Sequence, residues 1–129
     1  MWRTIKCMSH KIAIIEDDPA ILQMYQLKFE AEGYVVKTAK NGVEGLELLK
    51  GFNPDMVLLD IMMPQMDGLE MLAKLRQTPG GKTTPVIIFT NIGEQEIPRG
   101  LESLHITDTI AKAYHTPAQV AEKVAKLLA

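Results

Sequence analysis

Cysteine is nearly absent from this 129-residue sequence, which contains a single one, Cys7. One cysteine cannot form an internal disulfide, so a disulfide-stabilised fold is excluded and a reducing compartment is expected. No apolar stretch approaches the roughly 18 to 20 residues that cross a bilayer, and residues 1–11 lack the apolar segment of a signal peptide. The sequence therefore predicts a cytoplasmic protein that does not enter a membrane.

A charge excess of one sign is also absent. Lys and Arg number 14 against 16 Asp and Glu, for a net charge of -2, so broad electrostatic attraction to nucleic acid or an anionic membrane is not expected. The 47% hydrophobic and 23% charged residues are typical of a globular domain. We expect one domain over residues 11–129, an N-terminal extension over residues 1–10, and no direct DNA binding.

Five apolar segments of strand length recur, at residues 12–15, 34–38, 56–59, 86–89 and 107–111. The first, third and fourth are continuously apolar, which is typical of strands buried on both faces of a parallel sheet. The second and fifth contain polar residues, Lys37 and Asp108 among them, so they are predicted to lie nearer the edges. Helical patterns fill the gaps, and this alternation predicts an α/β fold with a doubly wound parallel sheet.

The predicted helices have recognisable ends. Asp18 and Thr116 each stand directly before a proline, as N-caps do, and Gly33 stands where a helix would end in a left-handed conformation. A fourth, short helix is predicted within residues 97–104 from the spacing of its apolar residues. Asp18 and Thr116 therefore predict where the helices after the first and fifth strands begin, and Gly33 predicts where the first helix ends.

Polar side chains stand at the ends of four predicted strands. Glu16 and Asp17 follow the first strand, Asp60 follows the third, Thr90 ends the fourth and Lys112 follows the fifth. The carboxyl ends of parallel strands meet at one edge of the sheet, which is where open α/β sheets bind ligands. Crowded carboxylates raise one another's pKa or require a cation, and an oxygen-lined site suits Mg²⁺.

These segments resemble the receiver domain of two-component response regulators. The motifs are Ile-Ile-Glu-Asp-Asp-Pro at 14–19, Val-Leu-Leu-Asp-Ile-Met-Met-Pro at 57–64, Asp67-Gly68, Ile-Ile-Phe-Thr at 87–90 and Lys112, and the likeness covers residues 11–128. The resemblance implies a flavodoxin-like fold with strand order 2-1-3-4-5. It also implies a phosphoacceptor signalling domain, which catalyses only its own phosphorylation and dephosphorylation.

The resemblance assigns a role to each polar residue at the strand ends. Asp60 would accept a phosphoryl group from a histidine kinase or a phosphotransfer protein, and Thr90 and Lys112 would contact that group. The Mg²⁺ ligands would be the side chains of Glu16, Asp17 and Asp60 and the backbone carbonyl of Met62. Because the last predicted helix ends the sequence, we expect a stand-alone receiver that signals through a protein partner.

Three features depart from the family pattern, and the first is Asn91, which follows Thr90 where the family has a small residue and would narrow access to Asp60. Ala113 follows Lys112 where the family usually has proline, and Thr109 stands where an aromatic residue is common. A cis bond before a residue other than proline costs about 2.5 to 4 kcal/mol, so we expect the Lys112–Ala113 bond to be trans. These departures put the usual output coupling in doubt and leave the phosphoryl chemistry intact.

Two alternative functions remain open. A scaffold could keep this fold and use only its surfaces, without phosphorylation. A flavodoxin-like ligand-binding module is the other alternative, although its phosphate-binding loop would present backbone amides where this sequence places acids.

Overall fold

A five-stranded parallel sheet forms the centre of the molecule. The computed structural model describes residues 10–61, 66, 68–90, 106–111 and 115–128, with the backbone alone at Thr90. The strands are β1 (Lys11–Ile15), β2 (Val35–Ala39), β3 (Met56–Leu59), β4 (Val86–Thr90) and β5 (Asp108–Ala111). Their order in the sheet is β2-β1-β3-β4-β5, which confirms the predicted flavodoxin-like α/β fold.

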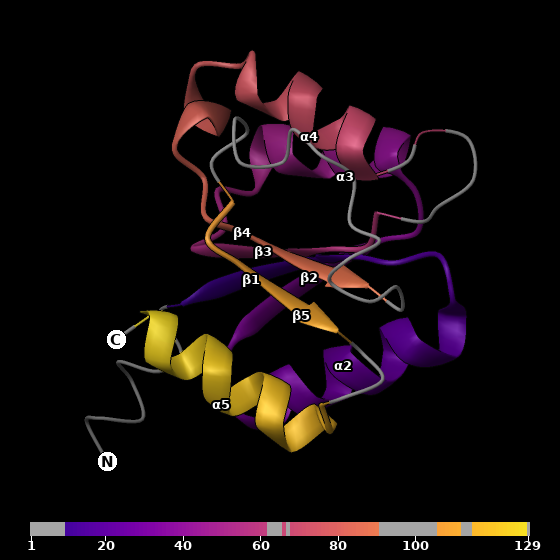
Figure 1. Ribbon diagram of the computed structural model, residues 1–129, viewed down its shortest axis with the longest axis vertical. Coiled ribbons are helices and arrows are strands. Elements are labelled where there is room, and N and C mark those ends of the chain that lie inside the picture. The colour runs from indigo at the N-terminus through magenta and orange to yellow at the C-terminus, as the bar shows by residue number, and fades with distance from the viewer. Residues whose placement is uncertain (1–9, 62–65, 67, 91–105, 112–114, 129) are drawn as a thin grey trace.

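Helices cover both faces of this sheet (Figure 1). The helices α2 (Pro19–Ala31) and α5 (Pro117–Leu128) lie on one face, and α3 (Gly42–Gly51) and α4 (Gly68–Arg76) lie on the other. A short 3-10 helix, η1 (Gly80–Lys82), follows α4. The helix predicted within residues 97–104 lies outside the described residues.

The central strands bury alternate side chains in two separate cores. In β1, Ile12 and Ile14 pack in the core beneath α2 and α5, whereas Ala13 and Ile15 pack in the core beneath α3 and α4. Every residue of β3 is likewise buried. Full burial of one large aliphatic side chain contributes about 1.5–3 kcal/mol, so the two cores hold β1 and β3 firmly in place. The prediction of strands buried on both faces is confirmed.

The first predicted edge strand differs from the observed one by a residue. β2 begins at Val35 rather than at residue 34, because the Tyr34 amide donates to the carbonyl of Phe29 (3.1 Å) and so belongs to the turn that ends α2. Gly33 in that turn has φ 98°, a left-handed conformation that favours glycine. The predicted left-handed end of this helix is confirmed.

Side-chain caps fix where α2 and α5 begin. Asp18 Oδ1 accepts hydrogen bonds from the amides of Ala20 (2.9 Å) and Ile21 (3.2 Å). Thr116 Oγ1 accepts from the Gln119 amide (3.1 Å), while Gln119 Oε1 accepts from the Thr116 amide (2.9 Å), which completes a capping box. Both predicted caps are confirmed, and the Asp18 cap positions α2 directly beyond the acidic end of β1.

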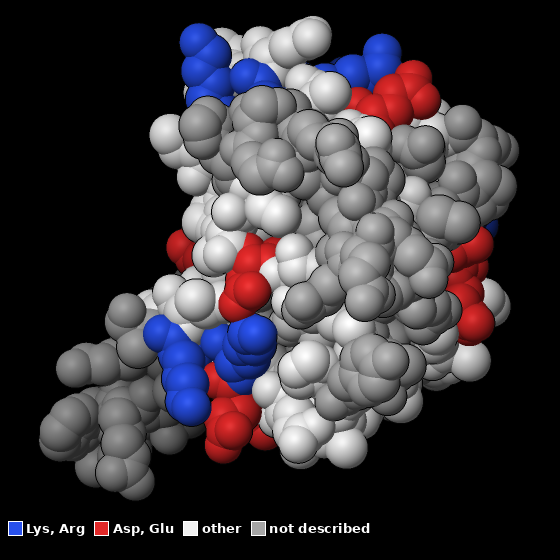
Figure 2. All heavy atoms as spheres, in the orientation of Figure 1, with Lys and Arg blue, Asp and Glu red and all other residues white. Residues whose placement is uncertain are grey.

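Charged side chains of both signs are mixed on the surface. On the face drawn in Figure 2, basic groups lie beside acidic groups among the coloured residues, in keeping with a net charge of -2. Within the part of the chain that the structure describes, no helix has the length and apolar character of a membrane span.

Candidate functional site

The acidic residues leave two neighbouring strands at the same edge of the sheet. β1 and β3 pair in parallel, with Ile15 opposite Leu59, so the residues that follow them emerge together. The Asp60 amide donates to the carbonyl of Ile15 (3.0 Å), and the Glu16 amide donates to the carbonyl of Ala39 (3.0 Å). Because these hydrogen bonds extend the sheet by one residue, the backbone of both acids is held by the neighbouring strand.

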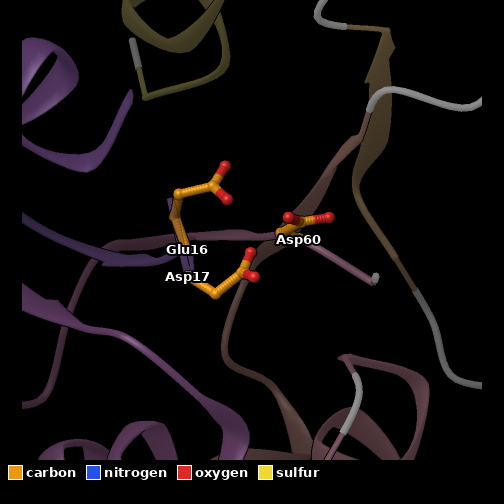
Figure 3. Close-up of side chains that lie close together, drawn as sticks. All are labelled: Glu16, Asp17 and Asp60. Carbon is orange, nitrogen blue, oxygen red and sulfur yellow. The ribbon is translucent and has the colours of Figure 1, made fainter. Parts of the chain in front are cut away.

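Three carboxylates converge at this edge (Figure 3). Glu16, Asp17 and Asp60 each contribute one oxygen to a group whose members all lie within 4.8 Å of one another. Glu16 and Asp60 are 1% and 4% exposed, whereas Asp17 is exposed. Negative charges this close repel one another, and burial strengthens the repulsion. The cluster therefore favours a cation.

The chemistry of these donors fits Mg²⁺. Carboxylate oxygens are hard ligands, and Mg²⁺ usually binds through one or two carboxylates while keeping several waters. The exposed side of the cluster at Asp17 leaves room for such waters. The predicted acidic site is thus assembled by the fold, and its use as a metal site belongs to the function proposed below.

Two glycines allow helices to begin against the segment that follows β3. A Cβ at Gly68 would collide with the carbonyl oxygen of Asp60 and approach Ile61 Cα to 2.6 Å. At the start of α3, a Cβ at Gly42 would lie 2.6 Å from the carbonyl oxygen of Met66. A Cβ at either position would force its neighbours to shift, so α4 packs directly on the backbone of Asp60 and Ile61, and α3 packs directly on Met66.

Tyr25 of α2 is a site neighbour that sequence analysis did not single out. Its side chain is 3% exposed and packs edge-on against Phe89 of β4, with ring centroids 4.8 Å apart and an interplanar angle of 84°. Burial raises the pKa of Tyr25 above its usual 10.0, and the charge of Glu16 raises it further. The phenol therefore stays neutral near the acidic cluster. The only signal in the sequence was a hydroxyl on an otherwise apolar helix face.

The remaining predicted site residues are not described in full. Met62 and Lys112 lie outside the described residues, as do Asp67 and the Lys112–Ala113 bond, and the side chain of Thr90 is not described. The backbone places Thr90 at the end of β4, opposite Ala111 at the end of β5. Lys112 follows β5 in the sequence, and β5 pairs with β4, which ends in Thr90. The roles expected of Thr90 and Lys112 stay predictions.

Comparison with known proteins agrees with this architecture. Residues 12–125 match the family described as the response regulator receiver domain. Because the match covers nearly the whole chain, the chain belongs to this family, the receiver domains of two-component response regulators.

Curated relatives are longer than this chain. The phosphate regulon transcriptional regulatory protein PhoB of Rhizobium meliloti is 36% identical over 121 residues, which are 93% of this chain and 53% of that protein. Response regulator MprA of Mycobacterium ulcerans is 39% identical over 83 residues, 64% of this chain and 35% of that protein. The chain thus spans about half the length of PhoB and less of MprA.

Solved structures match over nearly their full length. A putative response regulator from Chloroflexus aurantiacus has a TM-score of 0.82 and 28% identity, over 92% of this chain and 97% of that one. The response regulator TrrA from Thermotoga maritima, determined in complex with Mg(2+)-BeF, has a TM-score of 0.77 and 30% identity, over 92% of this chain and 98% of that one.

Proposed function

We propose that this receiver domain accepts a phosphoryl group on Asp60 from a histidine kinase or a phosphotransfer protein, and that the phosphorylated form signals by binding another protein. The observation that carries the proposal is the carboxylate cluster at the carboxyl edge of the sheet, in which Asp60 lies within 4.8 Å of two further acids. Membership of the receiver family supports the same reaction.

The acidic cluster would serve as a Mg²⁺ site. Its ligands would be the carboxylates of Glu16, Asp17 and Asp60 and the backbone carbonyl of Met62, with waters in the other positions. The complex of TrrA with Mg(2+)-BeF supports this assignment. When bound, Mg²⁺ would offset the negative charge that the incoming phosphoryl group adds to the site.

The transfer itself needs a nucleophile and positioned charges. A carboxylate oxygen of Asp60 attacks the phosphorus of the donor while the bond from phosphorus to the leaving group breaks, and the leaving group keeps the electron pair. Lys112 would pair with the charge of the bound phosphoryl group, and Thr90 would donate a hydrogen bond to one of its oxygens. The adjacent ends of β4 and β5 support both roles.

Proteins rather than DNA are the partners that fit this surface. Acidic and basic groups are mixed on the face in Figure 2, and the whole chain carries a net charge of -2. The longer relatives offer no guide to the partner of this chain. About half of PhoB lies outside the part that matches this chain, and its DNA-directed output is not expected here. We also propose a cytoplasmic location, where histidine kinases present their phosphoryl groups.

Intact mass measurement tests the phosphoacceptor. The full chain is incubated with acetyl phosphate and Mg²⁺, and we expect a mass gain of one phosphoryl group. Asp60→Asn should show none. Asp55→Asn is the matched control, because Asp55 lies before β3 at the opposite edge of the sheet, where it accepts a hydrogen bond from the Lys11 amide (2.7 Å).

Each alternative has its own outcome. Phosphate incorporated by Asp60→Asn at the normal yield would show that the acceptor is another residue. If the wild-type chain gained no mass from acetyl phosphate or from a phosphorylated histidine donor, yet still bound its protein partner, the scaffold function would replace the proposed one.

A further inference from the structure

Tyr25 contacts the strand that leads to one of the predicted site residues. Its ring meets the ring of Phe89 edge-on, with centroids 4.8 Å apart and an interplanar angle of 84°. Among the ring pairs of the described residues this is the shortest centroid distance, and both side chains are buried. Edge-to-face contact at this distance is a favourable arrangement of two aromatic rings. The contact therefore holds Phe89 in a fixed position relative to α2.

Phe89 stands next to the end of β4. It pairs with Ile110 of β5, and Thr90, the last residue of β4, pairs with Ala111. Phe89 and Thr90 share a planar peptide group, so a displacement of the Phe89 backbone moves the Thr90 backbone with it. A ring held from α2 thus restrains the strand end at which Thr90 is predicted to contact the phosphoryl group.

Tyr25 is also close to the acidic cluster. Its helix begins directly beyond the acidic end of β1, where the Asp18 amide donates to Glu16 Oε2 (3.3 Å) and Asp18 caps α2. Burial raises the pKa of Tyr25, and the negative charge of Glu16 raises it further, so the phenol lies within electrostatic reach of that carboxylate. One side chain is therefore near both the acidic cluster and the end of β4.

We propose that Tyr25 is a positioning residue for the phosphorylation of Asp60: its ring holds Phe89 and so keeps the backbone of Thr90 where this residue can contact the phosphoryl group. The inference rests on the proposed function, because it takes Asp60 as the acceptor. Tyr25 acts through Phe89 and is not a catalytic residue. A ring that merely filled the core would affect stability and leave the reaction rate of the folded protein unchanged.

The rate of mass gain with acetyl phosphate tests the role of the ring. Tyr25→Leu removes the ring, whereas Tyr25→Phe keeps it. At saturating donor and Mg²⁺, we expect Tyr25→Leu to react about ten-fold more slowly than the wild type, because a misplacement of ~1 Å can cost about a hundred-fold and a paired strand end moves less than that. Tyr25→Phe should keep the wild-type rate. The half-saturating Mg²⁺ concentration should be the same in all three proteins, because Tyr25 is not a metal ligand.

Phe29→Leu is the matched control. Phe29 lies on the same helix and in the same core, and its nearest described ring is that of Tyr34 (5.7 Å). Loss of this ring should also destabilise the protein, but it should leave the rate unchanged. Rates are compared at a temperature where circular dichroism shows that each variant is folded.

Hydrogen exchange of the metal-free chain gives a second readout that needs no reaction. Amides at the paired ends of β4 and β5 should exchange about five-fold faster in Tyr25→Leu than in Phe29→Leu, since loss of an aromatic pair favours local opening by about that factor. If Tyr25→Leu does not fold, Phe89→Leu removes the same ring contact from the other side and replaces it in both measurements.

The outcomes separate this inference from the proposed function. A wild-type rate in Tyr25→Leu, equal slowing by Tyr25→Leu and Phe29→Leu, or equal slowing by Tyr25→Leu and Tyr25→Phe would each overturn the positioning role. If the wild type is phosphorylated on Asp60 and Tyr25→Leu reacts as fast, this inference alone fails. If the wild type gains no mass, the proposed function fails with it.

Discussion

The three clustered carboxylates differ in their access to water. Glu16 and Asp60 are buried, whereas Asp17 is exposed. Replacement of a buried acid also disturbs the packing around it, so its effect on metal binding is mixed with an effect on folding. Replacement of Asp17 therefore tests metal binding with the least disturbance of folding.

Asp17→Asn should weaken Mg²⁺ binding at least about ten-fold, since even the loss of a residue that only orients a metal ligand costs that much. Without Mg²⁺, the same change should raise the free energy of unfolding by about 0.5 to 1 kcal/mol, because it removes one of three negative charges that repel one another. Calorimetric titration and urea unfolding with and without Mg²⁺ measure both effects. Equal stabilisation of variant and wild type by Mg²⁺ would contradict the assignment of Asp17 as a ligand.

Tyr25→Phe should make the stability less sensitive to alkaline pH. Burial and the Glu16 charge raise the pKa of Tyr25 above 10.0, so the folded state holds the phenolic proton more tightly than the unfolded state. This contribution to stability is complete below about pH 10 and is lost as the pH rises through the raised pKa. Urea unfolding midpoints from about pH 8 to about pH 11 should fall further for wild type than for the variant.

Absorbance of tyrosinate provides the control for that experiment. The chain has 3 tyrosines, and in the folded wild type one should ionise at a higher pH than an unfolded reference does. The late phase should be missing in Tyr25→Phe. If wild type and variant lost stability equally at alkaline pH, the raised pKa would have no part in folding.

At the scale of elements, the start of α4 and the end of β3 act as one unit. Gly68 packs on the backbone of Asp60 and Ile61, and its amide donates to the carbonyl of Ile61 (3.3 Å). The position of Asp60 therefore depends on a helix that begins eight residues later in the chain.

Gly68→Ala should destabilise the protein by about 1–3 kcal/mol, because the added Cβ has only backbone atoms to displace. It should also slow the phosphorylation of Asp60 by shifting its backbone. Gly51→Ala is the matched control, since a Cβ there meets nothing within 4 Å and alanine favours helix by up to about 1 kcal/mol. Thermal unfolding measures the stability of Gly68→Ala and Gly51→Ala, and the rate of mass gain with acetyl phosphate measures their phosphorylation. Equal stability of the two variants would contradict the close contact at Gly68.

For the whole molecule, the sheet order separates central from edge strands. β1 and β3 each have strand neighbours on both sides, whereas β2 and β5 each have one. The central strands are also covered by buried side chains on both faces, while β2 exposes Val35 and Lys37. The centre of the sheet should therefore be the last part to open.

Hydrogen exchange on the full chain tests this order. Amides of β1 and β3 should exchange only through global unfolding, and those of β2 and β5 should exchange earlier through local opening. The dependence of exchange rates on low concentrations of urea distinguishes the two routes. Edge-strand amides that exchange as slowly as those of β1 would contradict the expected order.

Much of this protein was determined by the sequence alone, because the signals are local. Continuous apolar runs identify the central strands, and Asp18, Gly33 and Thr116 mark helix ends through their own backbone or side-chain hydrogen bonds. The acidic cluster was also predictable, since parallel strands bring Glu16 and Asp60 to one edge whatever the details of packing. The predicted start of β2 was one residue too early, because the Tyr34 amide donates to the carbonyl of Phe29 in the turn after α2.

Other features depend on groups that are far apart in the chain, and only the tertiary structure decided them. Tyr25 of α2 packs edge-on against Phe89 of β4, and no local pattern in the sequence encodes a contact between residues so far apart in the chain. A groove of about 370 Å³ between the ends of α3 and α4 is lined by Leu46 and Leu49 from one helix and by Leu75 from the other. The periodicity of a strand predicts on which face of the sheet a side chain lies. Which helix ends lie side by side depends on how side chains fill the space between the sheet and the helices.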